Sequence, residues 1–389
     1  MPKLRLSHAL VLALCVSLAG CGVFKSKTNR ENIEPPIELA DIDNAISVDS
    51  AWNRSIGDGE RKLGLRQPVA ALGDTVYAAG PDGKLMALTR ASGKTLWEVE
   101  SETDRYSGGP AIGEGTLVVG TLDGQVIAYN PDNGSERWRA TVSSEVIAVP
   151  AIAQGVAVIR CNDGRVFAFS ITDGSRRWVY DRGLPALTLR GNGRPVVTGD
   201  RVFVGYDSGV VVALKLLDGV QIWEQTVAQG EGRNELDRMV DIDGEIVSNG
   251  SEVFAAAFNG QVVALDAGSG RPLWNRDMSV FSGLALAGDR LLVSDKAATV
   301  WALDSRTGAS IWRQDGLAHR WLSTPVVNGK RLAVGDLEGF LHVLDVETGS
   351  IVGRDRVGRD PIRATPQLAQ DLVLALTIDG KLAAYRIGP

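Results

Sequence analysis

The stretch Pro110-Ala-Ile-Gly-Glu-Gly-Thr-Leu-Val-Val-Gly-Thr-Leu-Asp-Gly-Gln-Val-Ile-Ala-Tyr-Asn130, followed closely by Gly134-Ser-Glu-Arg-Trp138, decides the fold. It holds three short runs rich in β-branched residues, 111–112, 117–120 and 126–129, and a fourth around Trp138. Each run is bounded by Gly, Asp or Asn, a pattern typical of strands. Asp123-Gly124 predicts a tight hairpin, because that turn needs the positive φ that glycine tolerates. The stretch therefore predicts a four-stranded meander, whose strands we name A (inner) to D (outer).

This unit recurs along the whole chain with fixed spacing. A turn glycine is followed by a second glycine ten residues later, and by a tryptophan four residues after that. The first position is held by Gly83, Gly124, Gly164, Gly209, Gly260, Ala298, Gly339 and Gly380, the second by Gly93, Gly134, Gly174, Gly219, Gly270, Gly308 and Gly349, and the third by Trp97, Trp138, Trp178, Trp223, Trp274, Trp312 and, as the one exception, Gly353. A period of about 40 residues with short strands inside it predicts an all-β fold, an eight-bladed β-propeller of four-stranded antiparallel blades.

A small residue also recurs, four positions after the first glycine. It is alanine in every unit except the seventh, which has Val343. A small side chain there lets neighbouring sheets approach closely, so that the tryptophan of strand D can pack across the blade boundary. We therefore interpret the six repeat tryptophans as packing residues, each contributing a few kcal/mol at about 25 cal/mol per Å² of buried apolar surface.

The eighth unit lacks its outer strand, because the chain ends at Pro389 before a second glycine can follow Gly380. Near the other end, Trp52 lies in a strand-like segment outside the repeats, 44–56. We expect this segment to supply the missing strand, since pairing the two chain ends removes an exposed sheet edge. The predicted propeller domain thus spans residues 44–389.

The N-terminal residues resemble a bacterial lipoprotein signal. Lys3 and Arg5 precede an apolar run over 9–20 that is too short to span a bilayer as a helix, and Leu18-Ala-Gly-Cys21 follows. The resemblance implies that residues 1–20 are a signal peptide, that Cys21 becomes lipidated, and that 21–43 form a flexible tether. Gly22 after the cysteine implies sorting to the outer membrane. The alternative is an ordinary signal peptide with an incidental cysteine.

Composition and motifs argue against several functions. With 41 basic and 47 acidic residues, the net charge of −6 and the lack of a basic stripe argue against nucleic-acid binding. The mature chain has two histidines, His319 and His342, which share no metal-ligand spacing, and Asp241-Ile-Asp243-Gly244 lacks the closing Glu of a calcium loop. Nucleophile-elbow and phosphate-loop motifs are absent. We predict no catalytic residues, no metal and no cofactor.

The repeat itself resembles the pyrroloquinoline-quinone-type propeller repeat, as in 264–274 and 302–312. That resemblance implies the fold, and it keeps a periplasmic quinoprotein-like dehydrogenase open as an alternative, although the chain lacks the adjacent cysteine pair of those enzymes. A propeller that binds a ligand in its central channel is a further alternative.

Two connections are longer than the rest. Trp178 lies 31 residues before Gly209, and Trp223 lies 37 residues before Gly260. Both insertions fall between strand D of one blade and strand A of the next, and long loops on a rigid scaffold are where binding concentrates. The first contains Leu187, Leu189 and Arg190, which suit a protein contact; the second contains the carboxylates of Glu235, Asp237, Asp241 and Asp243. Alternatively, the leucines fold back on the disc and the charges are merely solvated.

Three segments, 187–191, 235–243 and 317–325, resemble the BamB family, the lipoprotein propellers of the bacterial outer-membrane β-barrel assembly machinery. The resemblance covers nearly the whole chain, with Trp321 and Gly353 as departures. It implies a non-enzymatic scaffold, anchored to the outer membrane and facing the periplasm, that assists insertion of outer-membrane proteins. Its partner would be the central barrel-forming subunit, held by its periplasmic repeat domains, with unfolded outer-membrane proteins as a further partner. By position, the contacts would be Leu187, Leu189, Arg190, Asp241 and Asp243.

Overall fold

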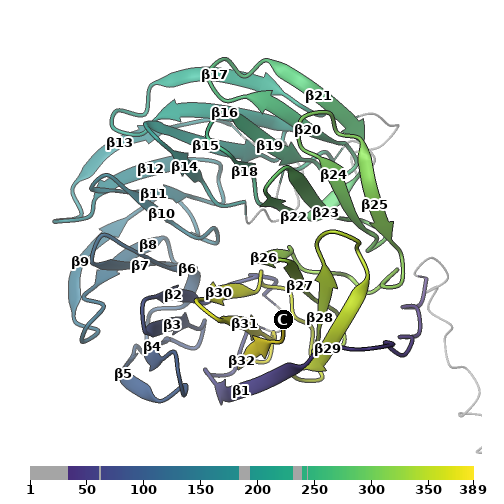
Figure 1. Ribbon diagram of the computed structural model, residues 1–389. Helices are drawn as coiled ribbons and strands as arrows, with labels where there is room; N and C mark the ends of the chain where they lie inside the picture. The colour runs from purple at the N-terminus through teal and green to yellow at the C-terminus, as the bar shows by residue number, and fades with distance from the viewer. Residues whose placement is uncertain (1–33, 61–62, 184–192, 231–238, 243) are drawn as a thin grey trace, which may run out of the picture. The chain divides into compact units, whose positions relative to one another are not determined.

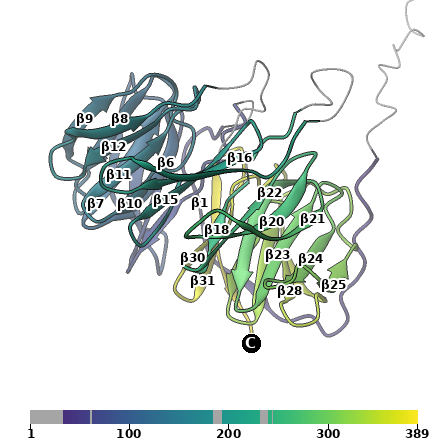
Figure 2. The same ribbon diagram turned by 90° about the horizontal axis from the view of Figure 1, so that it is seen from above.

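Eight copies of the predicted meander form eight separate four-stranded antiparallel sheets in the computed structural model. The structure describes residues 34–60, 63–183, 193–230, 239–242 and 244–389, and it divides into two units, 1–36 and 37–389. All strands belong to the second unit, where the sheets follow one another around a common centre (Figures 1 and 2). This confirms the predicted eight-bladed propeller.

The strands of blades one to four, in the order A to D, are β2 (Ala70–Leu72), β3 (Thr75–Ala79), β4 (Lys84–Thr89) and β5 (Thr95–Glu100); β6 (Tyr106–Gly113), β7 (Thr116–Thr121), β8 (Gln125–Tyr129) and β9 (Glu136–Thr141); β10 (Ala151–Ala153), β11 (Val156–Arg160), β12 (Val166–Ser170) and β13 (Arg176–Tyr180); and β14 (Val196–Thr198), β15 (Arg201–Tyr206), β16 (Val210–Lys215) and β17 (Gln221–Thr226). Strand β6 begins earlier than its predicted run, because irregular register around Gly108 lets pairing with β7 continue to Tyr106.

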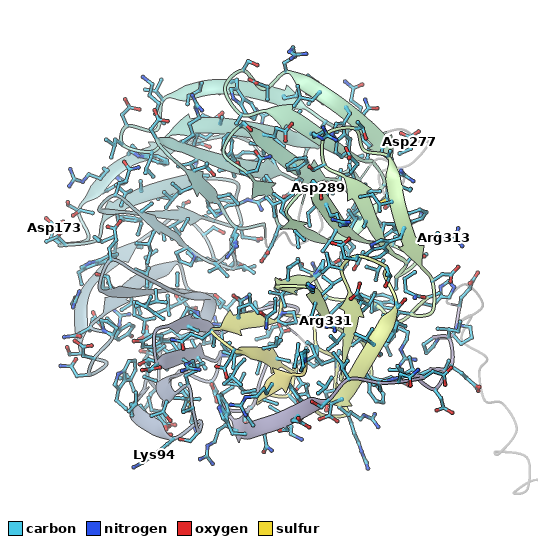
Figure 3. All side chains as sticks on the ribbon, viewed as in Figure 1. Lys94, Asp173, Asp277, Asp289, Arg313 and Arg331 are labelled. Atoms are coloured by element: carbon cyan, nitrogen blue, oxygen red, sulfur yellow. The ribbon has the colours of Figure 1, made fainter. Side chains whose placement is uncertain are left out.

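Blades five to eight consist of β18 (Val247–Ser248), β19 (Glu252–Ala256), β20 (Gln261–Asp266) and β21 (Pro272–Asp277); β22 (Val280–Ala287), β23 (Arg290–Asp295), β24 (Val300–Asp304) and β25 (Ser310–Gln314); β26 (Val326–Asn328), β27 (Arg331–Gly335), β28 (Phe340–Asp345) and β29 (Ile351–Arg356); and β30 (Gln367–Ala369), β31 (Leu372–Leu376) and β32 (Lys381–Ile387), completed by β1 (Val48–Ser55). Strands B and C are buried almost throughout, whereas charged side chains such as Lys94, Asp173 and Arg313 point outward at the rim (Figure 3).

The repeat tryptophans join neighbouring blades, as predicted. The Trp138 ring of blade two lies on Gly174 of blade three so closely that a Cβ atom there would be 2.7 Å from it. The indole N–H of Trp138 also donates to the carbonyl of Ile171 at 2.8 Å. The same packing recurs for Trp52 on Gly93, Trp97 on Gly134, Trp178 on Gly219, Trp223 on Gly270, Trp274 on Gly308 and Trp312 on Gly349. Glycine is therefore required at these turns both for space and for positive φ, which is 70° at Gly174.

The ring closes through both ends of its chain. Strand β1 pairs antiparallel with β32, and this register places Trp52 opposite Ala384. Trp52 thereby takes the tryptophan position of blade eight, and its indole N–H donates to the carbonyl of Arg90 in blade one at 2.7 Å. The predicted closure by an N-terminal strand is confirmed.

Candidate partner-binding face

One face of the ring carries every B–C turn together with the D–A connection that leads to the next blade. In blade one, for example, the N–H of Ser101 donates to the carbonyl of Gly83 at 2.9 Å, and in blade four that of Val227 donates to Gly209 at 2.9 Å. We name this side the connection face. Both long connections, 181–195 and 227–246, therefore start and end on the connection face, on either side of blade four.

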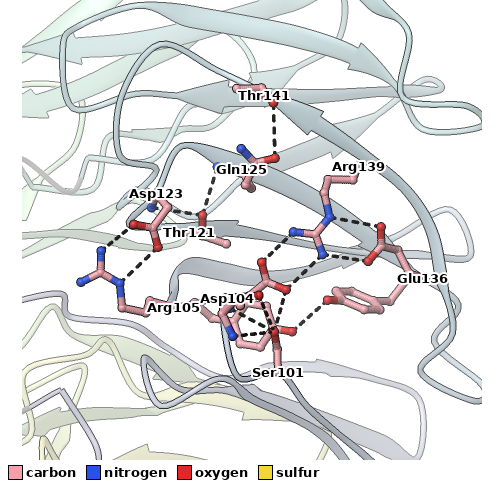
Figure 4. Close-up of polar contacts among 12 residues, drawn as sticks. Ser101, Asp104, Arg105, Thr121, Asp123, Gln125, Glu136, Arg139 and Thr141 are labelled. Carbon is pink, nitrogen blue, oxygen red and sulfur yellow. Dashed lines mark hydrogen bonds and ion pairs between the residues drawn. The ribbon is translucent and has the colours of Figure 1, made fainter.

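A connection of ordinary length is fastened by its own polar contacts. Between blades one and two, Asp104 accepts from Arg139 of β9 at 2.6 Å and from the Ser101 hydroxyl at 2.9 Å (Figure 4). Hydrogen bonding from Arg139 holds the pKa of Asp104 below its usual range. Next to it, Arg105 pairs with Asp123 of the B–C turn at 2.6 Å. Such a connection lies along its own blades and leaves little chain for a partner.

The first long connection ends on a buried ion pair. Arg160, the last residue of β11, binds Asp207 in the B–C turn of blade four at 2.6 Å, and both side chains are 4% exposed. A second nitrogen of Arg160 donates to the carbonyl of Gly193 at 3.3 Å. Since buried charges are tolerated only when paired and hydrogen-bonded, this arrangement fixes the point where the connection returns to the ring.

The beginning of the same connection lies near the same turn. Arg182 pairs with Glu224 of β17, and its guanidinium carbon is 5.6 Å from the ring centre of Tyr206. The guanidinium carbon of Arg160 is 5.7 Å from the same ring centre. Tyr206 is fully buried, and this burial raises the pKa of its hydroxyl. The ring of Tyr206 thus contacts Arg182, at the start of the first connection, and Arg160, which holds the end of that connection at Gly193.

The second long connection returns onto the same turn of blade four. The N–H of Ile242 donates to the carbonyl of Tyr206 at 3.3 Å, and the N–H of Phe258 donates to that of Asp241 at 2.9 Å. Ile242 is fully buried and packs so tightly on Gly205 that a Cβ atom there would lie 2.5 Å from it. The Tyr206–Asp207 turn is therefore a common support for both long connections.

Most of the predicted contact residues fall outside the described part of the chain. Leu187, Leu189, Arg190 and Asp243 lie in ranges that the structure does not describe, as do Glu235, Asp237 and the predicted lipidation site Cys21. Asp241 is described, and it is 1% exposed. Its backbone lies near the Tyr206–Asp207 turn, because the N–H of the adjacent Ile242 donates to the carbonyl of Tyr206.

Sequence reasoning missed the four residues that hold the first connection, Arg160, Arg182, Tyr206 and Asp207. A signal for one of them was present, since Arg160 ends the otherwise apolar run Val156-Ala-Val-Ile-Arg160 in a strand expected to be buried. A charge at such a position requires a partner, although its partner 47 residues away left no local pattern.

Polar groups also converge in the central channel. Residues that precede or begin the inner strands line a cavity there, among them Arg66, Arg194, Glu245 and Arg363. Arg66 donates to the carbonyl of Phe281 at 3.0 Å, and Arg194 lies 3.9 Å from Glu245. This mainly basic lining suits an anion better than a metal ion, and no group of three or more His, Cys, Asp or Glu residues with metal-binding geometry occurs in the described ranges.

Nothing in the described portion of the chain forms a helix that could cross a membrane. The connection face is the leading candidate for function, because both long connections are held there at the Tyr206–Asp207 turn.

Comparison with known proteins gives a consistent result. A family model described as "Outer membrane protein assembly factor BamB" matches residues 43–107, 81–314 and 302–388. The chain is 43% identical to the outer membrane protein assembly factor BamB of Xanthomonas campestris pv. campestris, over 97% of each chain. Its fold is similar to the crystal structure of BamB from Moraxella catarrhalis, with a TM-score of 0.80 and 25% identity over 87% of this chain and all of that one. A europium-containing methanol dehydrogenase shares the fold alone, with a TM-score of 0.71 and 14% identity over 87% and 93% of the two chains.

Proposed function

The chain belongs to the BamB family of outer membrane protein assembly factors, and from this premise we propose that it is a non-enzymatic scaffold that docks the central, barrel-forming subunit of the assembly complex. The docking site is the connection face around blade four. Lipidation at Cys21 anchors the protein to the outer membrane, with the propeller in the periplasm, where it assists the insertion of outer-membrane proteins.

The observation that carries this proposal is the shared support of the two long connections. Both return to the Tyr206–Asp207 turn, and the Arg160–Asp207 pair fixes one of them at the ring. Loops with fixed ends lose less conformational freedom on binding than free ones, so more of the contact energy appears as affinity. Leu187, Leu189 and Arg190 then contact the periplasmic repeat domains of the partner.

Asp241 differs from the other proposed contacts in being 1% exposed in the free ring. Its proposed part in docking is therefore to position the second connection. Asp243, two residues later, remains the proposed direct contact of that connection.

Unfolded outer-membrane proteins are proposed as a second, transient partner. The D strands of blades four to six present exposed apolar side chains, Ile222, Leu273 and Ile311, at the outer edge of their sheets. An open edge of this kind accepts an added strand through backbone hydrogen bonds. A dehydrogenase activity has less support, since the likeness to those enzymes is one of fold and the chain lacks their adjacent cysteine pair.

Calorimetric titration of the purified protein with the periplasmic domains of the barrel-forming subunit tests the proposal. We expect Leu189→Glu to abolish binding without changing the melting temperature, and Arg190→Glu to weaken it by about 2 kcal/mol or more. Leu217→Glu is the matched control, because Leu217 is 62% exposed in the C–D turn of blade four, on the opposite face. Unaltered affinity in Leu189→Glu would contradict the proposed site, and absence of binding by the unmodified protein would contradict the docking function.

A further inference from the structure

The first described residues of the propeller unit lie against the ring. Residues 37–47, which we name the strap, run across blades six and seven before β1 begins. The N–H of Ile37 donates to the carbonyl of Ala318 at 3.1 Å, Leu39 packs on the apolar cluster between these blades, and the N–H of Ile46 donates to Val352 of β29 at 2.8 Å. The predicted tether, 21–43, therefore contacts the ring through its last residues, 37–43.

A buried arginine fixes the start of the strap. Arg320 is 2% exposed, and it donates from one nitrogen to the carbonyl of Ile37 at 2.9 Å. Its other nitrogens bind Asp336 at 2.7 Å and Glu338. Because Asp336 also holds His342 at 2.9 Å, the guanidinium that positions Ile37 is itself held in a polar network inside blade seven.

Two exposed apolar side chains lie at the point where the strap begins. Trp321 directly follows the buried Arg320 and is 62% exposed, and Ile37, bound through its backbone to Ala318 and Arg320, is 42% exposed. We name this pair the exit patch. Every other tryptophan in the described ranges is buried or half-buried, so the exposure of Trp321 is exceptional in this chain.

The backbone at the exit patch is held in an uncommon conformation. Trp321 has φ of 51° and His319 has φ of 60°, in the left-handed region that bulky residues rarely adopt. The connection 315–325 is nevertheless pinned, since the N–H of His319 donates to Ala297 at 2.8 Å and the carbonyl of Arg320 accepts from Leu337 at 3.0 Å. Strain retained at an exposed position in this way is typical of functional sites, and here it holds a large apolar side chain in solvent.

We propose that the exit patch is a membrane contact, in which Trp321 and Ile37 enter the headgroup region of the bilayer that holds the lipidated Cys21. This inference rests on the proposed lipid anchor. Only the sixteen residues 21–36 separate the anchor from the patch, a length that spans at most about 55 Å. Tethering raises the effective concentration of the patch at the membrane, so a contact too weak to bind alone becomes populated.

The chemistry of the patch suits a bilayer surface. A tryptophan combines an apolar ring with one N–H donor, and it prefers the interface between lipid and water. Charge does not select the bilayer at this patch, because the exposed Lys296 of the neighbouring B–C turn is offset by the exposed Glu38 next to Ile37; the preference comes from the aromatic ring of Trp321. The patch lies at blades six and seven, whereas the long connections flank blade four, so membrane and partner contact different sectors of the connection face.

Tryptophan fluorescence of the full-length, lipidated protein tests the inference. The protein is reconstituted into vesicles of phosphatidylethanolamine and phosphatidylglycerol with brominated acyl chains, and the emission of Trp321 is obtained as the difference from Trp321→Phe. We expect brominated chains to quench this difference signal about twofold or more, and to leave it poorly accessible to aqueous iodide. The control is Trp321→Phe combined with Leu217→Trp, which moves a tryptophan to a residue with the same exposure, 62%, on the opposite face.

The outcomes separate the patch from the anchor. If the protein floats with the vesicles while Trp321 stays open to iodide and unquenched by bromine, the membrane contact is wrong and the anchor stands; a protein partner would then be the occupant of the patch. If the protein fails to float, the lipid anchor and the membrane contact are both wrong. Equal quenching of the control tryptophan at residue 217 would also overturn the inference, since quenching would then not depend on the patch.

Discussion

Gly353 lies opposite Val343 in the register of β28 and β29, at the position where each of the other blades pairs a tryptophan with an alanine. The exception falls at the one boundary where the next blade has no C–D turn, because its outer strand β1 arrives from the N-terminus. Ile46 and Val48 fill that space, so that a Cβ atom on Gly353 would lie 2.8 Å from Val48. Gly353 thus faces Val343, the one residue at its position in the eight blades that is larger than alanine.

Restoring the repeat at this position is therefore expected to destabilise the protein. Gly353→Trp would displace Ile46 and Val48, and overpacking of this kind costs about 1–3 kcal/mol. The measurement is the midpoint of urea unfolding. An unchanged or higher midpoint would show that Ile46 and Val48 do not occupy the tryptophan site.

Loss of the closing tryptophan is expected to be among the most damaging single changes. Trp52→Ala removes a side chain that is 8% exposed and packs on Gly93, and such large-to-small changes cost about 3–5 kcal/mol. Trp321→Ala, at a position that is 62% exposed, should stay within about 0.5 kcal/mol. Comparable losses in the two variants on thermal unfolding would argue against closure through β1.

Two glycines separate the effect of backbone conformation from that of space. Gly174 and Gly155 have φ of 70° and 76°, yet only Gly174 has a neighbour, the Trp138 ring, within reach of a Cβ atom. Gly155→Ala should cost about 1–2 kcal/mol from the left-handed conformation alone. Gly174→Ala should cost clearly more, and equal unfolding free energies would mean that the tryptophan moves aside freely.

Breaking the buried pair below the long connections is expected to cost stability and binding together. Arg160→Met leaves Asp207 buried without its ion-pair partner, which costs about 3–5 kcal/mol. Arg105→Met breaks an exposed pair with Asp123 and should cost about 1 kcal/mol or less. Adding Asp207→Asn to Arg160→Met should recover much of the stability but not the affinity for the partner, because Gly193 stays unheld; recovered affinity would refute the positioning role of Arg160.

His342 is expected to make stability depend on pH. Burial lowers the pKa of His342 below its ordinary 6.5. The charges of Arg320 and Arg354 lower this pKa further, whereas Asp336 raises it. The unfolded chain therefore binds a proton near pH 6.5 that the folded chain does not bind. Stability is complete above this pH and falls as the pH decreases toward the folded pKa, by up to about 1.4 kcal/mol per pH unit. In urea unfolding between pH 7 and pH 5, His342→Gln should show a smaller slope; an identical slope would exclude this histidine.

The spacing of Gly124, Gly134 and Trp138 predicted the blade, its recurrence predicted the blade count, and the incomplete eighth unit together with Trp52 predicted the closure, because turns and strand periods are local properties of the chain. The strap was not predictable in this way. Arg320 binds a carbonyl 283 residues away, and neither partner stands out in its own segment. The same holds for Asp241. Its acidic neighbours in the sequence indicated an exposed residue, but it is buried, and its carbonyl accepts a hydrogen bond from the N–H of Phe258. Contacts between distant segments depend on the finished ring, so sequence patterns could place the long connections but not what supports them.

The closure of the ring also sets an order of events. Strand β1 is the first of the described strands in the chain, yet β32, with which it pairs, is the last. Seven blades have all their strands before the C-terminal residues are present, but the eighth does not, so the first strand keeps an open edge until those residues arrive. A chain that stops short of β32 would leave this edge unpaired. Premature termination would therefore give an aggregation-prone protein and not a stable propeller with fewer strands.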